Sequence, residues 1–153
     1  EGDATATIAT LSVTILALFN ALGRVGCGTI SDKIGRINTL TIMLVVGVVG
    51  LFLISRAGAG DTAIFMVGIC LVGLAFGSFM GVMPGFCAEQ FGPKNNGVNY
   101  GIMFIGFSLA GIVGPKLLDA FEAPYTTAYY IAMGLGIVGL LLTFVYRAMS
   151  KAK

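Results

Sequence analysis

The sequence predicts an all-α fold, a polytopic bundle of five transmembrane helices. Of its 153 residues, 57% are hydrophobic and only 10% are charged, and the mean hydropathy is +0.96. Ordinary soluble domains carry about 25% charged residues, so this chain has too few charges to cover a surface in water. A surface that faces lipid needs none, and the apolar residues gather in five long segments.

Each segment is near or above the ~20 residues that an α-helix needs to cross a hydrocarbon core about 30 Å thick. The segments cover residues 5–29, 39–55, 62–87, 97–118 and 125–146. Helices are expected because a span in lipid must satisfy its own backbone hydrogen bonds, whereas transmembrane strands would be only about 10 residues long. Together the five spans form one transmembrane domain over residues 1–153.

The apolar segments differ in length, in charge and in their small residues. The first segment is apolar around a single interior charge, Arg24, and the second is the shortest. The third carries glycine at every fourth position, and the fourth carries a similar stripe of small residues; these are Gly73, Gly77, Gly81 and Gly85, then Gly106, Ala110 and Gly114. That spacing places each stripe on one helix face, where a neighbouring helix can approach closely.

Short polar connectors separate the segments, so sequential helices are expected to be antiparallel. The connectors cover residues 31–38, 56–61, 88–96 and 119–124. Cytoplasmic flanks are enriched in Lys and Arg. One side holds Lys33, Arg36, Lys94, Arg147, Lys151 and Lys153, and the other holds Arg56 and Lys116. This asymmetry predicts a multi-pass protein of the cell membrane with a cytoplasmic carboxy terminus and with Glu1 outside.

The composition also argues against several classes of function. A formal charge of +2 is too small to suggest a nucleic-acid partner. The chain has no His and no acid pair inside a span, so neither catalytic residues, nor metal ligands, nor a cofactor site is expected. Its three cysteines, Cys27, Cys70 and Cys87, lie within or beside apolar runs and are interpreted as buried thiols.

Arg24 is the residue that most suggests a function. It lies eight positions before Asp32, about 12 Å along a helix at 1.5 Å per residue. A central Arg costs roughly 2.5 to 3.5 kcal/mol on membrane-insertion scales, so it usually faces a polar cavity and a partner. No predicted span holds an interior Asp or Glu. The counter-charge must come from helices outside this chain, from water, or from an anionic cargo whose carboxylate matches the guanidinium fork. Asn20, one turn earlier, can donate a further hydrogen bond.

The first connector contains a specific motif. Gly28, Ser31, Asp32, Gly35 and Arg36 resemble the G-x-x-S-D-x-x-G-R loop of the major facilitator superfamily. A tight turn at Gly35 would let Asp32 cap a helix end or pair across it, while Lys33 and Arg36 stay at the anionic inner surface. The resemblance implies a loop after helix eight of twelve. The five spans would then be helices eight to twelve, the partial carboxy-terminal domain of a transporter whose amino-terminal helices are missing.

A longer stretch resembles one branch of that family. Residues 83–101, MPGFCAEQFGPKNNGVNYG, and 110–115, AGIVGP, are similar to the oxalate/formate antiporter and monocarboxylate transporter branch. Membership implies alternating-access transport of small carboxylates such as lactate, pyruvate, formate or oxalate. Those monocarboxylate carriers have an Arg in helix eight with a polar residue four positions before it. Arg24 and Asn20 match this pattern, with Asn in place of the acid that some carriers have, which counts against proton coupling through this pair.

The same resemblance favours a monocarboxylate over oxalate. Oxalate carriers of the branch have a Lys midway along helix eleven, where this chain has residues 104–108, FIGFS. Nearby, Tyr100, Asn99 and Ser108 are candidate polar contacts, and Phe104 and Phe107 are candidates for an apolar wall. Two alternatives remain: a major facilitator carrier for a neutral solute, and a non-transporting membrane subunit or receptor.

Overall fold

The computed structural model describes residues 2–58, 60–121 and 125–151, and it confirms the all-α fold. Within these residues there are five helices, each long and apolar enough to cross a membrane. They are α1 (Gly2–Ile34), α2 (Arg36–Arg56), α3 (Thr62–Phe91), α4 (Asn96–Asp119) and α5 (Thr126–Lys151). Glu1, Lys153 and the end of the last connector lie outside the described residues.

The first connector is much shorter than the sequence predicts. Instead of a link over residues 31–38, α1 continues to Ile34 and α2 begins at Arg36, so only Gly35 is non-helical. Its φ of 90° favours glycine, and its N–H donates to the Ser31 carbonyl at 3.0 Å. The expected tight turn is present. The expected length was wrong because helices extend beyond the apolar core, and charged side chains at their ends are compatible with helix.

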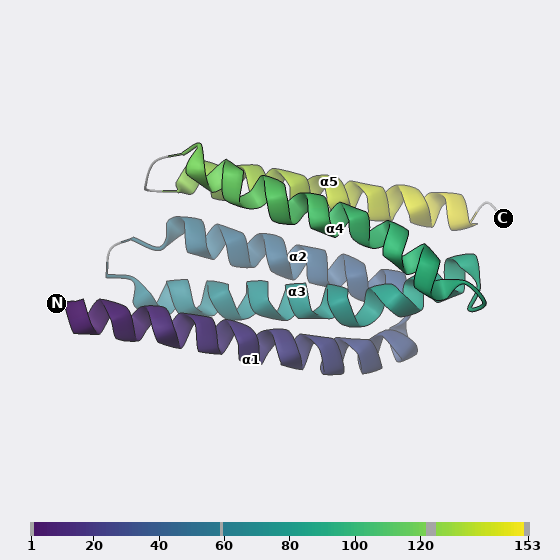
Figure 1. Cartoon of the computed structure of the whole chain (residues 1–153), viewed down its shortest axis with the longest axis horizontal. Coiled ribbons are helices and arrows are strands. Elements are labelled where there is room, and N and C mark those ends of the chain that lie inside the picture. The colour runs from purple at the N-terminus through teal and green to yellow at the C-terminus, as the bar shows by residue number, and fades with distance from the viewer. Residues whose placement is uncertain (1, 59, 122–124, 152–153) are drawn as a thin grey trace.

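Helix α3 holds the bundle together. It packs against α1 and α2 along much of its length and against α4 more sparsely, while α5 packs on α2. Figure 1 shows α3 between α1 and α2, and α4 and α5 at the top of the view, on the side away from α1. Although α4 and α5 overlap in that view, their main contacts are with different helices.

The glycine stripe of α3 is the surface on which α1 lies. A methyl group added at Gly73, Gly77 or Gly81 would meet the α1 main chain at Leu16, Asn20 or Arg24, respectively. The residue numbers of these contacts increase in the same direction along both helices, so α1 and α3 run parallel. The expected close approach is confirmed at these three glycines, whereas Gly85 faces the Arg36 side chain. The stripe of α4 is different, because methyl groups at Gly106 and Gly114 would meet no described atom within 4 Å.

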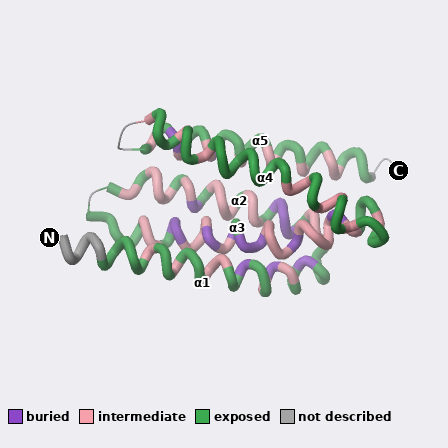
Figure 2. Tube along the Cα trace, viewed as in Figure 1, coloured by how far each residue is buried: buried purple, intermediate pink, exposed green. Residues whose placement is uncertain are grey.

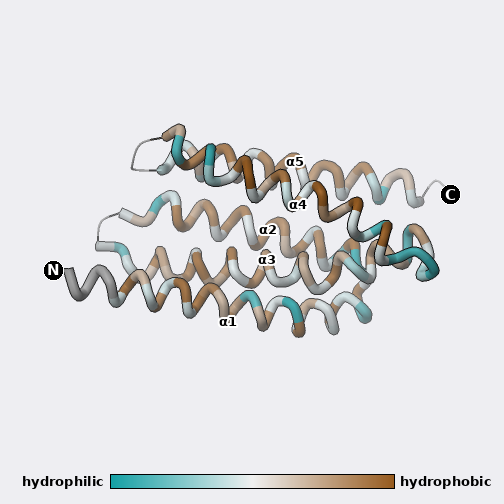
Figure 3. Tube along the Cα trace, in the orientation of Figure 1, coloured by the Kyte–Doolittle hydropathy of each residue, from teal (hydrophilic) through white to brown (hydrophobic). Residues whose placement is uncertain are grey.

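Burial is concentrated where α1, α2 and α3 meet. Cys27, Leu40 and Val82 form a core cluster there, and Figure 2 shows several buried positions along α3. Helix α4 has no buried residue. Many large apolar side chains point outward on every helix, and Figure 3 shows hydrophobic residues along all five. Such a surface is costly in water but suits contact with lipid or with further transmembrane helices.

Candidate functional site

Arg24 and Asn20 form a polar pair on the otherwise apolar middle of α1. The Arg24 Nε donates a hydrogen bond to the Asn20 Oδ1 at 3.0 Å, across the four-residue spacing that places two side chains on one helix face. This bond uses the Asn20 amide oxygen as acceptor and so leaves its NH₂ group as a donor. Among the described residues, Arg24 makes no ion pair. Its two terminal nitrogens therefore remain available to an anion.

Close helix packing fixes the position of this pair. The main chains of Asn20 and Arg24 rest against Gly77 and Gly81 of α3, so α1 cannot slide without separating the two helices. Arg24 itself is exposed in this five-helix bundle. The main chain that carries the guanidinium is thus packed against α3, and the Arg24 side chain is not part of the core formed by Cys27 and its neighbours.

A second charged cluster lies where the first three helices end. Arg36 pairs with Asp32 (Nη2 to Oδ1, 3.2 Å) and with Glu89 of α3 (Nε to Oε1, 2.5 Å). Its guanidinium lies over Gly85, where a side chain would collide with it. The motif residues Asp32 and Arg36 therefore tie the ends of α1, α2 and α3 together.

Other members of the motif have simpler roles in the structure. Gly28 accepts a hydrogen bond from the Ser31 hydroxyl at 2.6 Å through its carbonyl oxygen, and Lys33 is exposed in the last turn of α1. Sequence reasoning missed Glu89 as the partner of Arg36. Its signal was available, since the connector over residues 88–96 was assigned to the same membrane face as Arg36.

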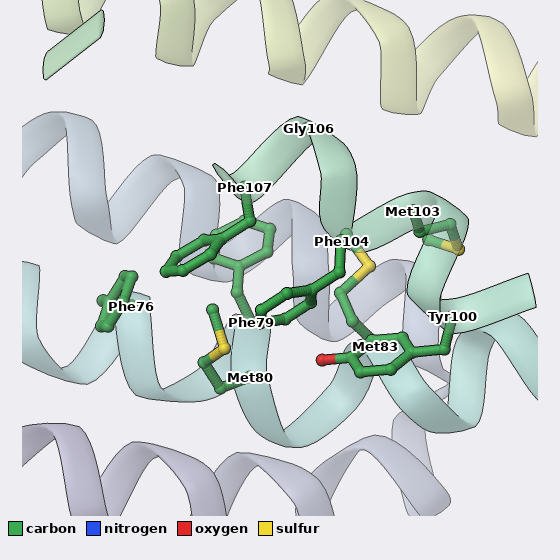
Figure 4. A pocket seen from close by; sticks show the side chains of 9 residues that line it. All are labelled: Phe76, Phe79, Met80, Met83, Tyr100, Met103, Phe104, Gly106 and Phe107. Atoms are coloured by element: carbon green, nitrogen blue, oxygen red, sulfur yellow. The ribbon is translucent and has the colours of Figure 1, made fainter. Parts of the chain in front are cut away.

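An apolar cavity of about 300 Å³ lies between α3 and α4. Figure 4 shows the side chains around it. It is lined by Phe76, Phe79, Met80, Met83, Tyr100, Met103, Phe104, Gly106 and Phe107. The Phe104 ring centroid lies 4.8 Å from that of Phe107 and 5.3 Å from that of Tyr100. These three rings form a continuous aromatic wall on α4.

The candidate residues of α4 are thus divided by the structure. Tyr100 lines the cavity with Phe104 and Phe107. Asn99 and Ser108 are not part of the lining, and the Ser108 hydroxyl instead donates to the Phe104 carbonyl at 3.2 Å. The α3 side of the cavity carried no sequence signal, because its Phe and Met side chains lie in the long apolar part of that helix.

The described residues hold no group of three His, Cys, Asp or Glu side chains that could bind a metal ion. The polar groups of the described residues include the Arg24 and Asn20 pair, the Arg36 cluster, the Tyr100 hydroxyl, and Arg147, whose Nη2 donates to the Thr41 Oγ1 at 3.1 Å. The Arg24 and Asn20 pair can hydrogen-bond an anion, because a guanidinium and an amide NH₂ are both donors.

Comparison with known proteins gives a consistent family. The family model described as the Major Facilitator Superfamily matches residues 3–153. The uncharacterized MFS-type transporter YhjX of Escherichia coli strain K12 is 35% identical over 101 residues, which is 66% of this chain and 25% of that protein. The oxalate:formate antiporter of Oxalobacter formigenes is 30% identical over 148 residues, 94% of this chain and 35% of that protein.

A fungal protein is also similar. The MFS transporter asaE of Aspergillus flavus is 31% identical over 115 residues, 75% of this chain and 26% of that protein. The chain therefore spans between a quarter and about a third of the length of these relatives. No solved structure matches.

Proposed function

Because the chain belongs to the major facilitator superfamily, we propose that it is the five-helix carboxy-terminal part of a secondary transporter of small monocarboxylates. The proposed carrier works by alternating access, with a site near the middle of the bilayer between its two halves. Helices that precede this chain would complete that site. The carboxy terminus would lie on the cytoplasmic side of the cell membrane.

The observation that carries this proposal is that Arg24 has no acidic partner among the described residues. A guanidinium on an apolar transmembrane helix, hydrogen-bonded to Asn20 but without an acidic partner among the described residues, needs a negative charge from elsewhere. A carboxylate provides one with matching geometry, because two parallel N–H donors meet its two oxygens. The Asn20 NH₂ group can donate to the same anion.

Two features of α4 support a monocarboxylate over a dicarboxylate, although one relative is an oxalate:formate antiporter. The first is that the middle of α4 carries no Lys to hold a second carboxylate. The cavity beside the mid-helix residues Phe104 and Phe107 is apolar instead. A second carboxylate at this place would lose its hydration without gaining a cation, which is costly.

The proposal is tested by counterflow into proteoliposomes that contain the full-length carrier. Labelled pyruvate should accumulate against preloaded lactate or pyruvate and should resist competition by a sugar. Arg24→Gln should abolish this uptake, whereas Arg24→Lys should retain a small part, because it keeps the charge but loses the two-pronged geometry. Arg56→Gln, which changes an exposed Arg at the end of α2, is the matched control and should leave uptake intact.

The other outcomes identify the alternatives. Accumulation of a sugar but no carboxylate would indicate a carrier for a neutral solute. Absence of counterflow for every solute, in a protein that is folded and inserted, would indicate a subunit or receptor that does not transport. Unchanged pyruvate uptake in Arg24→Gln would refute the role of Arg24.

A further inference from the structure

Arg147 near the end of α5 is a second cation without an acidic partner. Its Nη2 donates a hydrogen bond to the Thr41 Oγ1 of α2 at 3.1 Å, and the Thr41 hydroxyl donates to the Ile37 carbonyl at 2.7 Å. The Arg147 Nε is buried without an acceptor among the described residues, and neither of their two ion pairs involves Arg147. A charge that is partly removed from water is costly without an ionic partner. This guanidinium therefore needs an anion from outside the five helices.

An apolar groove of about 310 Å³ lies next to this cation, between α2, α3 and α5. On α2 it is lined by a stripe of residues three and four apart, which share one helix face; they are Ile37, Leu40 and Leu44. Thr41 belongs to the same stripe. On α5 the groove is lined by Thr143, and Arg147 lies one turn later on the same face. Because Arg147 bonds to Thr41, its guanidinium lies at the edge of the groove.

The groove and the cation match the two parts of a phospholipid in depth. Helix α5 begins at Thr126, about 32 Å from Arg147 at 1.5 Å per residue, and the hydrocarbon core is about 30 Å thick. Arg147 thus lies at the level of the head groups. The groove extends along α5 to Gly139, about 12 Å further into the bilayer, which is most of the depth of one leaflet.

We propose that this groove binds an anionic phospholipid, with the phosphate on Arg147 and one acyl chain along the apolar walls. A guanidinium offers a phosphate two parallel N–H donors. A zwitterionic lipid carries its own cation next to the phosphate, and Arg147 would repel it. The end of the bundle with Arg147 is the one proposed above to face the cytoplasm, where the leaflet is rich in anionic lipids. The lipid site is separate from Arg24 and goes beyond the proposed function.

Charge complementarity favours a lipid over a further apolar helix as the occupant. A helix would have to carry an acidic side chain to the level of Arg147, whereas every anionic phospholipid has its phosphate there. The groove is also open to the surroundings of the five helices, since Leu142 on its α5 wall is 63% exposed.

The test measures lipid binding to the purified full-length carrier in detergent by native mass spectrometry. The carrier is titrated with dioleoylphosphatidylglycerol or with dioleoylphosphatidylcholine, and it should bind one molecule of the first at least about tenfold more tightly. Arg147→Gln should weaken phosphatidylglycerol about tenfold or more, and Arg147→Lys should weaken it less because it keeps the charge. Arg56→Gln is the matched control, since it removes one exposed charge at the other end of α2, and should leave the affinity unchanged.

Two neighbouring leucines of α5 test the acyl-chain part of the site. Leu141 and Leu142 are 59% and 63% exposed, but only Leu142 lines the groove. Leu142→Gln places an amide against the acyl chain and should weaken phosphatidylglycerol about fivefold. Leu141→Gln makes the same change outside the groove and should have no effect. This pair keeps Arg147 intact, so it tests the site even if Arg147→Gln does not fold.

Three results would overturn the inference. Equal affinity for phosphatidylglycerol in Arg147→Gln and the unmodified carrier would indicate that a side chain of the preceding helices pairs with Arg147. Equal affinity of the unmodified carrier for the two lipids would exclude selection by charge. Displacement of the lipid by an equal concentration of glycerophosphoglycerol, which has the head group but no acyl chains, would indicate a site for a free anion only.

Discussion

Replacing Gly77 by alanine tests the packing that positions the candidate site. The added methyl group would overlap three main-chain atoms of Asn20, its Cα, carbonyl carbon and carbonyl oxygen. Main-chain atoms cannot rotate aside as a flexible side chain can, so α1 and α3 must move apart. Overpacking of this kind costs about 1–3 kcal/mol of folding free energy, and Arg24, one turn from Asn20, would move with α1.

Gly77→Ala also gains helix propensity, and a control substitution with the same gain allows this effect to be subtracted. Alanine is a better helix former than glycine by about 0.5–1 kcal/mol, and this partly offsets the clash. Gly111→Ala receives that gain on an exposed position of α4 with no described atom within 4 Å. Gly77→Ala should therefore be less stable than Gly111→Ala by about 1–3 kcal/mol.

The assay is unfolding of the purified full-length carrier by SDS titration in mixed micelles, followed by far-UV circular dichroism. Gly77→Ala should unfold at a lower SDS fraction than Gly111→Ala, and its pyruvate uptake should fall as well. Equal midpoints for the two variants would refute the reasoning, because they would show that α1 does not rest on the glycine face of α3.

Two further predictions concern the ends of the helices and the thiols. The Arg36 and Glu89 side chains are 23% and 54% exposed, so water and salt should screen their ion pair. A double-mutant cycle with Arg36→Gln and Glu89→Gln should give a coupling energy of only about 0.2–1 kcal/mol, which falls with added salt. A coupling energy that does not change with salt would contradict the placement of this ion pair at a water-facing end of the bundle. Cys70 is half-buried whereas Cys27 and Cys87 are buried, so mass spectrometry after N-ethylmaleimide treatment should find Cys70 modified first. Equally fast labelling of Cys87 would show that this thiol is not buried in the bundle.

Much of the fold follows from hydropathy alone. The five spans are evident because long apolar runs with short polar links leave few other arrangements in lipid. The spacing of Gly73, Gly77 and Gly81 also predicted a close neighbour on one face of α3. It did not predict that this neighbour is α1, because glycines mark a surface that can be approached without naming the helix that approaches it. That pairing depends on how all the helices share the available contacts.

The candidate site was less accessible to sequence reasoning. Arg24 stands out because a charge in an apolar segment is costly, and Asn20 follows from helical spacing. The cavity was only half visible: the aromatic residues of α4 were candidates, but Phe76 and Met80 look like any other residues of an apolar helix. Asn99 and Ser108 were selected for their polarity, yet a serine in a transmembrane helix can bond its own backbone, as Ser108 does.

Equilibrium binding of labelled pyruvate to the purified carrier tests the central claim most directly, because it separates recognition of the anion from the conformational steps of transport. A hydrogen bond to a charged group contributes about 1.5–3 kcal/mol, and loss of the charge also removes a pairing in a water-poor site. Arg24→Gln should therefore raise the dissociation constant by about 10- to 100-fold or more, while Arg56→Gln should leave it unchanged. Equal affinity in Arg24→Gln and the unmodified carrier would contradict the account.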